Sequence, residues 1–196
     1  MPRAGLTTAR VVQEAEDVAD EVGLSHLTLT AIAPRLGVRM PSLYKHVAGM
    51  DALLRLVAIH ATQELADLFA RAAAGKAGAE ALTAISTSWR AWAKTYPGRY
   101  AATVRAPDRD DAEHIAASNE ALQIVLAVLV GYQLSGDDAI DAARVFRATL
   151  HGFISLEQAG GFGLPVDVDR SFERLIAGLA GTLGTWTLDQ TGATTR

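Results

Sequence analysis

Basic, hydroxyl-bearing and aromatic side chains gather in one short stretch of this chain, from residue 39 to residue 46. Ser42, Tyr44 and Lys45 can hold phosphate oxygens or contact the edges of bases. No Asp or Glu occurs between Val22 and Met50, although several acids precede this window. Phosphates repel carboxylates, so an acid-free basic window favours contact with a nucleic acid. A surface helical hairpin with solvated basic side chains is the alternative that the pattern leaves open.

Two short helices joined by a tight turn are predicted around this stretch, from Thr28 to Val47. Thr28 is a good N-cap, Gly37 suits a left-handed residue that ends a helix, and Pro41 is tolerated in a first helical turn. The apolar positions that recur at helical spacing are Leu29, Ile32, Ala33, Leu36, Leu43 and Val47. Such a pair is typical of a helix-turn-helix, which places its second helix in the major groove of DNA.

The segment from about Thr7 to Leu56 resembles the DNA-binding domain of the tetracycline-repressor-like (TetR) family of transcriptional regulators. Residues 23–54 carry the resemblance, with the sequence GLSHLTLTAIAPRLGVRMPSLYKHVAGMDALL. The resemblance implies that the third helix of the chain enters the major groove. The residues implied to contact bases or phosphates are Thr28, Arg39, Met40, Pro41, Ser42, Tyr44, Lys45 and His46.

Three other positions modify this expectation. Met50 stands where the family commonly has a lysine that contacts phosphate. Pro34 lies inside the second helix, where it removes a backbone hydrogen bond and should bend the helix. Arg3 is expected to reach DNA as part of a flexible basic arm. The first two features predict weaker binding to the DNA backbone than is usual in the family.

Composition restricts the rest of the chain. Of its 196 residues, 49% are hydrophobic and 20% charged, which is typical of a globular, helix-prone protein. The net charge of −4 argues against a non-specific polyanion binder. Cysteine is absent, which excludes disulfides, thiolate metal sites and thiol nucleophiles, and fits a reducing cytoplasm. The longest apolar run, 121–130, is too short to span a bilayer, so no membrane partner is expected.

Hydrophobic periodicity predicts an all-α fold with about nine helices. The first ends near Gly23, and the helix-turn-helix supplies the next two. The remaining helices are expected at 50–73, 79–95, about 98–105, 110–131, 137–159 and 167–188. The predicted organisation is a DNA-binding domain at 1–48, an effector-binding and dimerisation domain at 49–188, and a flexible tail at 189–196.

A second resemblance covers residues 146–165, FRATLHGFISLEQAGGFGLP. This stretch is similar to the His-Gly-containing C-terminal region of one branch of the same family. The resemblance implies that it belongs to the domain that binds an effector and forms the dimer.

Aromatic residues and histidines are the candidates for an effector pocket. Trp89, Trp92 and Tyr96 share one helix face, and large aromatics with a polar tip suit a mostly apolar ligand. The full set of candidates is His60, Trp89, Trp92, Tyr96, Tyr100, Phe146 and His151. Ordinary core packing is the alternative for the tryptophans, and a core or interface role is favoured for His151.

No catalytic site, metal site or cofactor is predicted. The acidic residues at 108–113, together with His114, have neither calcium-loop nor zinc-site spacing, and they sit where carboxylates favour a helix start. The GGFG loop lacks the strand and Gly-Lys-Ser/Thr of a phosphate-binding loop, and no Gly-x-Ser-x-Gly sequence occurs. An all-α hydrolase, or a small-molecule-binding protein without DNA binding, remains the alternative class.

The prediction is therefore a ligand-responsive regulator, a repressor that binds near-palindromic operator DNA as a homodimer. Its effector would be a largely apolar small molecule. The last two helices are expected to pack against their mates in the dimer through small residues. Those residues are Ala142, Ala143, Ala177, Gly178, Gly181 and Gly184.

Overall fold

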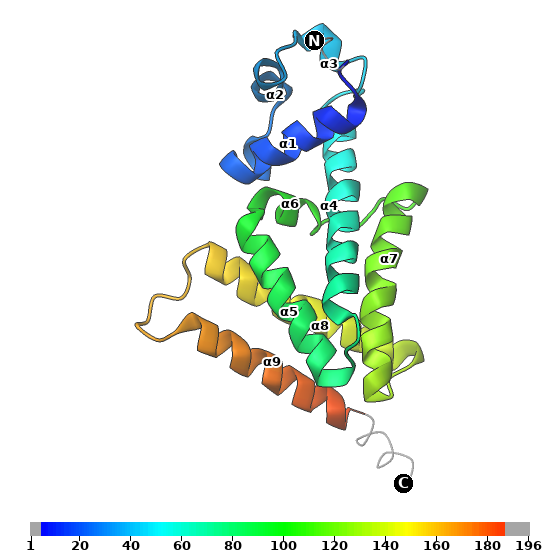
Figure 1. Cartoon of the computed structure of the whole chain (residues 1–196), viewed down its shortest axis with the longest axis vertical. Coiled ribbons are helices and arrows are strands. Elements are labelled where there is room, and N and C mark those ends of the chain that lie inside the picture. Colours follow the sequence, from blue (N-terminus) through cyan, green and yellow to red (C-terminus); the bar gives the residue numbers. More distant parts are fainter. Residues whose placement is uncertain (1–4, 187–196) are drawn as a thin grey trace. The chain divides into compact units, whose positions relative to one another are not determined.

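The structure is a computed structural model that describes residues 5–186, and over this range it confirms the all-α prediction (Figure 1). It contains nine α-helices, two short 3₁₀ helices and no strand within that range. The elements are α1 (Thr8–Val22), η1 (Leu24–His26), α2 (Leu29–Arg35), α3 (Met40–Leu43), α4 (Met50–Ala73), α5 (Gly78–Thr95), α6 (Pro97–Ala102), α7 (Ala112–Leu129), η2 (Val130–Tyr132), α8 (Gly136–Gln158) and α9 (Val168–Thr185).

The helix boundaries follow the periodicity closely, with α4 beginning and ending at the predicted residues. The main difference is α3, which is α-helical only over Met40–Leu43 and continues as a turn to His46. Arg3 and the predicted tail at 189–196 lie outside the described residues.

The chain divides into two compact units that differ from the predicted domains. The first unit comprises 1–64 and 95–118, and the second comprises 65–94 and 119–196. The first unit therefore includes residues 50–64 of α4 and all of α6, in addition to the predicted helix-turn-helix domain. The functional assignment of 1–48 and 49–188 stays a prediction.

The core of the first unit joins α1, α2 and α3 to the first half of α4. Its fully buried side chains include Val11, Ile32, Leu43, Leu53 and Val57. These residues come from four helices, two of which, α2 and α3, are too short to be stable alone, so shared burial of apolar surface holds the helices together.

Helix α6 approaches α1 unusually closely within the first unit. A Cβ atom on Gly98 would lie 2.1 Å from the carbonyl carbon of Ala19. The carboxylate of Asp20 accepts hydrogen bonds from the backbone N–H groups of Gly98 and Arg99, both at 2.9 Å. Helix α6 therefore begins against α1, with its free N–H groups satisfied by a side chain from that helix.

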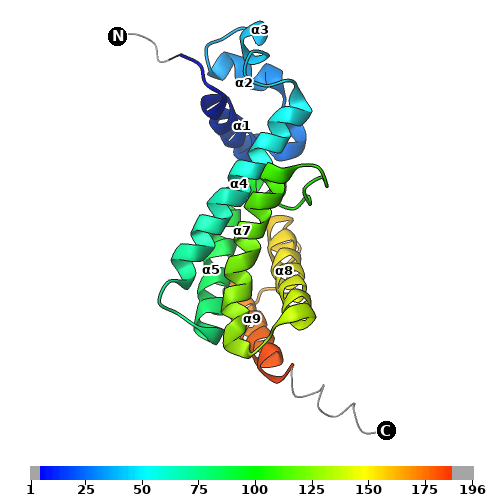
Figure 2. The same cartoon turned by 90° about the vertical axis from the view of Figure 1, so that its right-hand side faces the viewer.

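The second unit contains most of α5 and all of α8 and α9 (Figure 2). These three helices are amphipathic and bury apolar side chains. Those that are almost fully buried include Leu82, Ile85, Phe146, Leu150, Ile154, Ile176 and Leu183. A buried ion pair connects two of these helices: the guanidinium of Arg90 on α5 forms a two-pronged contact with the carboxylate of Glu157 on α8.

One helical stretch in the described part, Ala112–Tyr132, is long and apolar enough to cross a membrane by length and composition alone. It is longer than the apolar run at 121–130 considered from the sequence. The core helix of a folded domain meets the same two criteria, so the finding is weak evidence for a membrane.

Candidate nucleic-acid interface and ligand site

Local capping shapes α2 as the sequence predicts. The Oγ1 atom of Thr28 accepts a hydrogen bond from the backbone N–H of Ala31 at 3.2 Å. Gly37 adopts a φ of +66°, the left-handed conformation that allows the chain to turn into α3. Pro34 is the penultimate residue of α2. The helix ends beside the proline and does not continue past it through a bend.

The turn after α3 is fixed to the first unit at both ends. Leu43 is fully buried, and the backbone N–H of Val47 donates to the carbonyl of Leu43 at 3.0 Å. The hydroxyl of Thr8, at the start of α1, donates to the carbonyl oxygen of His46 at 3.3 Å. The segment 40–47 is therefore attached to the first unit through the buried Leu43 and the contact of His46 with Thr8.

Most of the side chains predicted to contact DNA are accessible. Thr28, Arg39, Pro41, Tyr44 and Lys45 are exposed, with Tyr44 at 55%. Ser42 and His46 are half-buried. The structure thus places a basic and aromatic surface on α3 and the turn that follows it, and the DNA contacts themselves stay a prediction.

Two methionines of this region face the core. Met40 and Met50 are partly buried and pack against the hydrophobic cluster of the first unit. Met40 was predicted near base edges; it contributes to packing and keeps part of its surface accessible, so its DNA contact stays a prediction. The sequence could not separate these roles, because methionine is apolar and equally compatible with either side of a short helix.

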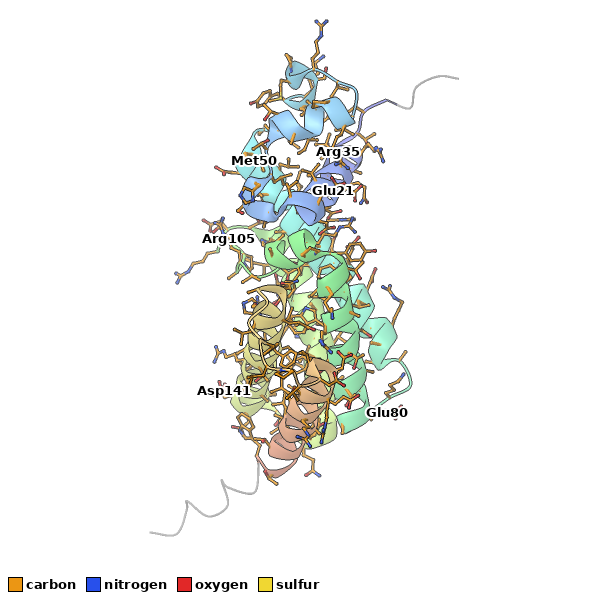
Figure 3. All side chains as sticks on the ribbon, turned by 90° about the vertical axis from the view of Figure 1, so that its left-hand side faces the viewer. Glu21, Arg35, Met50, Glu80, Arg105 and Asp141 are labelled. Carbon is orange, nitrogen blue, oxygen red and sulfur yellow. The ribbon has the colours of Figure 1, made fainter. Side chains whose placement is uncertain are left out.

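Arg35 does not add free positive charge to the acid-free window. Its guanidinium pairs with Glu14 and, two-pronged, with Glu21, both on α1 (Figure 3). The hydrogen bond from Arg35 holds the pKa of Glu21 below its usual range. The acids of α1 therefore neutralise Arg35, and Arg39 and Lys45 remain as the exposed cations of the window.

The residues predicted for the effector pocket fall in both units. His60, Tyr96 and Tyr100 belong to the first unit, and the others, Trp89, Trp92, Phe146 and His151, belong to the second. In the first unit, the Nδ1 atom of His60 lies 2.7 Å from the Oε1 atom of Glu16, and Arg99 lies over the ring of Tyr96. Neither interaction indicates that His60 or Tyr96 contacts a ligand.

Trp89 is the candidate in the second unit with the clearest sign of a missing partner. Its ring packs edge-on against Phe69 at 5.3 Å and lies 6.0 Å from Phe146. The indole Nε1–H is buried and has no hydrogen-bond partner among the described residues. Buried donors are nearly always satisfied by protein or ordered water, so this N–H is available to a water molecule or to an acceptor on a bound molecule.

The hydroxyl of Tyr132 in the same unit is also buried without a partner in the described part, and burial raises its pKa. Sequence reasoning missed Tyr132 and Phe69. Both lie beside apolar helical runs, where their type and spacing indicate only core packing.

The acidic segment before α7 has a structural role in the first unit. The carboxylate of Asp111 accepts from the backbone N–H of His114 at 3.1 Å, and it pairs with Arg55, which also contacts Glu113. The hydrogen bond from Arg55 lowers the pKa of Asp111 to about 2. These contacts account for the acids at this helix start by capping and ion pairing.

Comparison with known proteins identifies the class of protein to which this chain is similar. Residues 82–179 match the family model described as the tetracyclin repressor-like C-terminal domain. The chain is 36% identical over 178 residues to the HTH-type transcriptional regulator Rv0681 of Mycobacterium tuberculosis, covering 90% of this chain and 81% of the relative. It is 30% identical over 167 residues to the regulator YobS of Bacillus subtilis, covering 85% and 87%.

A solved structure supports the same class. The crystal structure of the regulatory protein SCO4313 has a TM-score of 0.71 and 27% identity, covering 89% of this chain and 95% of that one. The chain belongs to the tetracycline-repressor-like family. It is a DNA-binding transcriptional regulator of the helix-turn-helix type, and the alternative of an all-α hydrolase or a carrier is not favoured.

Proposed function

We propose that this regulator is a cytoplasmic repressor that binds a near-palindromic operator as a homodimer and leaves it when an effector binds. The observation that carries the proposal is the exposed, acid-free surface of α3 and its following turn. Two proteins with the same fold support the effector step. They are the Streptomyces coelicolor protein ActR in complex with (S)-DNPA, with a TM-score of 0.66 and 20% identity, and a TetR variant from Acinetobacter baumannii in complex with minocycline, with 0.69 and 22%.

In the proposed DNA complex, the side chains of the helix-turn-helix fall into two sets, one that would contact bases and one that would contact phosphates. Arg39, Pro41 and Ser42 lie at the start of α3 and would contact base edges. Tyr44, Lys45 and His46, with the N-terminal end of α2 at Thr28, would contact phosphates. Met40 would contribute mainly by holding α3 on the core.

The proposed dimer forms through α8 and α9. Val145 and Leu156 on α8 are exposed at 38% and 53%. On α9, Ala177, Gly178, Gly181 and Gly184 are exposed, and no atom lies within 4 Å of where a Cβ on any of these three glycines would be. Ala142 and Ala143 are buried inside the second unit, which removes them from the interface predicted from the sequence. The glycines leave this surface of α9 without bulky side chains. Together with the exposed apolar side chains on α8, this surface supports close packing of helices from two copies.

The effector is proposed to bind in the second unit beside Trp89, as a largely apolar molecule with a hydrogen-bond acceptor for the indole N–H. Trp92, Phe146 and His151 are the other proposed contacts there. Helix α4 supplies residues 50–64 to the first unit and 65–73 to the second, so it is the proposed carrier of the signal. The effector must bind more tightly to the conformation that does not fit DNA.

The DNA interface is tested by replacing Lys45 with alanine. The variant should bind all DNA sequences more weakly, because a phosphate contact is lost without any change in base readout. The dependence of log affinity on log salt should flatten by roughly one unit per subunit. The measurement is a gel-shift titration at several salt concentrations, on DNA selected from random sequences by the purified protein.

Lys76→Ala is the matched control, since Lys76 is an exposed lysine of the loop after α4, remote in sequence from the motif. It should keep the wild-type salt slope. Footprinting of the selected DNA should show two half-sites one helical turn, or a multiple of it, apart. An unchanged slope for Lys45→Ala would remove Lys45 from the phosphate contacts, and a single half-site would contradict the dimer.

The effector site is tested by Trp89→Phe, which keeps an aromatic ring and deletes the buried N–H. Compounds that raise the melting temperature of the wild-type protein should bind the variant about fivefold more weakly, the cost of one neutral hydrogen bond. Affinities are measured by calorimetry, with Trp186→Phe as a control that should bind like wild type. Equal affinity of the variant and wild type would place the effector elsewhere.

A further inference from the structure

One group of histidine and carboxylate side chains in the described part is close enough to share a cation. It consists of Glu16 on α1 and of His60 and Glu64 on α4, all in the first unit. Their potential donor atoms all lie within 4.8 Å of one another. His60 and Glu64 are four residues apart on one helix and therefore project from the same face, toward α1.

The surroundings of this group, counted with the group itself, contain more acidic than basic side chains. Arg99 lies among four carboxylates: its guanidinium nitrogens are 2.8 Å from Asp17, 3.1 Å from Asp20, 3.4 Å from Glu64 and 3.9 Å from Glu16. One guanidinium faces four carboxyl groups, and burial raises the pKa of two of them, Glu16 and Asp20. A second cation would therefore find an attractive potential there.

Glu16 is the member of the group that most clearly lacks a hydrogen-bond donor for one of its oxygens. Its side chain is fully buried, and its Oε2 atom accepts no hydrogen bond from any described residue. Burial raises the pKa of Glu16, and the hydrogen bond with His60 opposes that effect. The Nε atom of Arg99 lies 3.9 Å from this oxygen, which is too far for a hydrogen bond. A bound cation would lower the cost of burying the carboxylate.

The neighbouring carboxylates have partners of their own. Asp20 accepts from the backbone N–H groups at the start of α6, and Asp17 accepts from Gln13 at 3.2 Å and from Arg99. Glu64 has a longer contact, because the Nη1 atom of Arg99 lies 3.4 Å from each of its oxygens. The remaining candidate ligands are Glu16, His60 and Glu64. The side chains of His60 and Glu64 are 44% and 30% exposed, which leaves the site open to ions from solvent.

We propose that Glu16, His60 and Glu64 bind one divalent transition-metal ion of the Zn²⁺ and Co²⁺ class, with water completing the coordination. One imidazole nitrogen and two carboxylate oxygens are a donor set that such ions accept. Bonds of about 2.2 Å at tetrahedral angles place two ligand atoms about 3.6 Å apart. The donor atoms, which lie within 4.8 Å of one another, would therefore have to approach by up to about 1 Å. The ion would link α1 to α4 inside the unit that contains the helix-turn-helix.

The experiment titrates CoCl₂ into the full-length protein after treatment with EDTA and its removal. It should show one bound Co²⁺ per chain by calorimetry, visible absorption bands from a coordinated nitrogen, and displacement of both signals by ZnCl₂. His60→Gln and Glu64→Gln should each weaken Co²⁺ binding at least tenfold. Both positions are partly exposed, and circular dichroism would verify that the variants fold.

His26→Gln is the control, because His26 is an exposed histidine of the same unit that contacts Ser25 and the carbonyl of Val22. It should bind Co²⁺ like wild type. Binding weaker than millimolar, or equal binding by His60→Gln and wild type, would overturn the proposal and leave His60 and Glu16 as a simple ion pair. The titration contains no DNA or effector, so its outcome is independent of the proposed repressor function.

Discussion

Replacing Gly98 with alanine should lower the free energy of unfolding of the first unit by about 3 kcal/mol or more. The added Cβ would lie 2.1 Å from the carbonyl carbon of Ala19, 2.3 Å from its oxygen and 2.5 Å from the backbone nitrogen of Asp20. These are backbone atoms of α1, which cannot rotate away as a side chain would. Helix α6 must therefore withdraw from α1, breaking the two hydrogen bonds that Asp20 accepts from its N–H groups.

Urea unfolding followed by circular dichroism measures this loss, and hydrogen exchange of α1 amides would locate it in the first unit. Gly163→Ala is the matched control, because no atom lies within 4 Å of its Cβ position and its φ is not in the left-handed region. The control should change stability by less than about 1 kcal/mol. A Gly98→Ala protein as stable as the control would show that α6 is not packed this closely on α1.

Glu157→Ala should destabilise the second unit by about 3 kcal/mol, because it leaves Arg90 buried without its main partner. Arg90 is only 8% exposed. Its guanidinium pairs with Glu157 and Asp169 and lies 4.6 Å from the ring centre of Phe172. The same arginine thus joins α5 to α8 and α9, and removing the carboxylate costs the desolvation of a charge in addition to the contact itself.

Asp169→Asn is the control for Glu157→Ala, because the Asp169 side chain is 74% exposed and an exposed ion pair contributes little. It should change stability by less than about 1 kcal/mol in the same urea experiment. Similar losses for the two variants would show that Arg90 does not depend on Glu157.

The contribution of Glu157 should also depend on pH. The hydrogen bond from Arg90 holds the pKa of Glu157 below its ordinary value of 4.5. A lowered native pKa stabilises the fold above the unfolded-state value, and this stabilisation disappears as the pH falls through the native value. The stability difference between wild type and Glu157→Ala should therefore be full at pH 7 and shrink below pH 4.5. A difference that stays constant with pH would contradict the ion pair.

Local signals in the sequence determined the helices and the motif. The Thr28 cap, the left-handed Gly37, the length of α4 and the apolar spacing of α2 all arise from interactions over a few residues, so they can be predicted without tertiary structure. The family resemblance of residues 23–54 depended on the same local pattern, and the comparisons confirm the class it implied.

Tertiary structure decided which of these side chains are free to act. Arg35 lies in the acid-free window, but Glu14 and Glu21 neutralise it from another helix. Met40, predicted near base edges, is partly buried against the core, and its DNA contact stays a prediction. Ala142 and Ala143 were predicted at the dimer interface and are buried.

The polar contacts of the first unit could not be predicted from the sequence either. His60 faces Glu16 from 44 positions away, while Arg99 reaches Asp17 across 82 positions. The effector-pocket role of His60 stays a prediction. Such pairings depend on how separate helices meet in space. A one-dimensional pattern records the face that a residue occupies on its own helix, but not the residue that the neighbouring helix places opposite it.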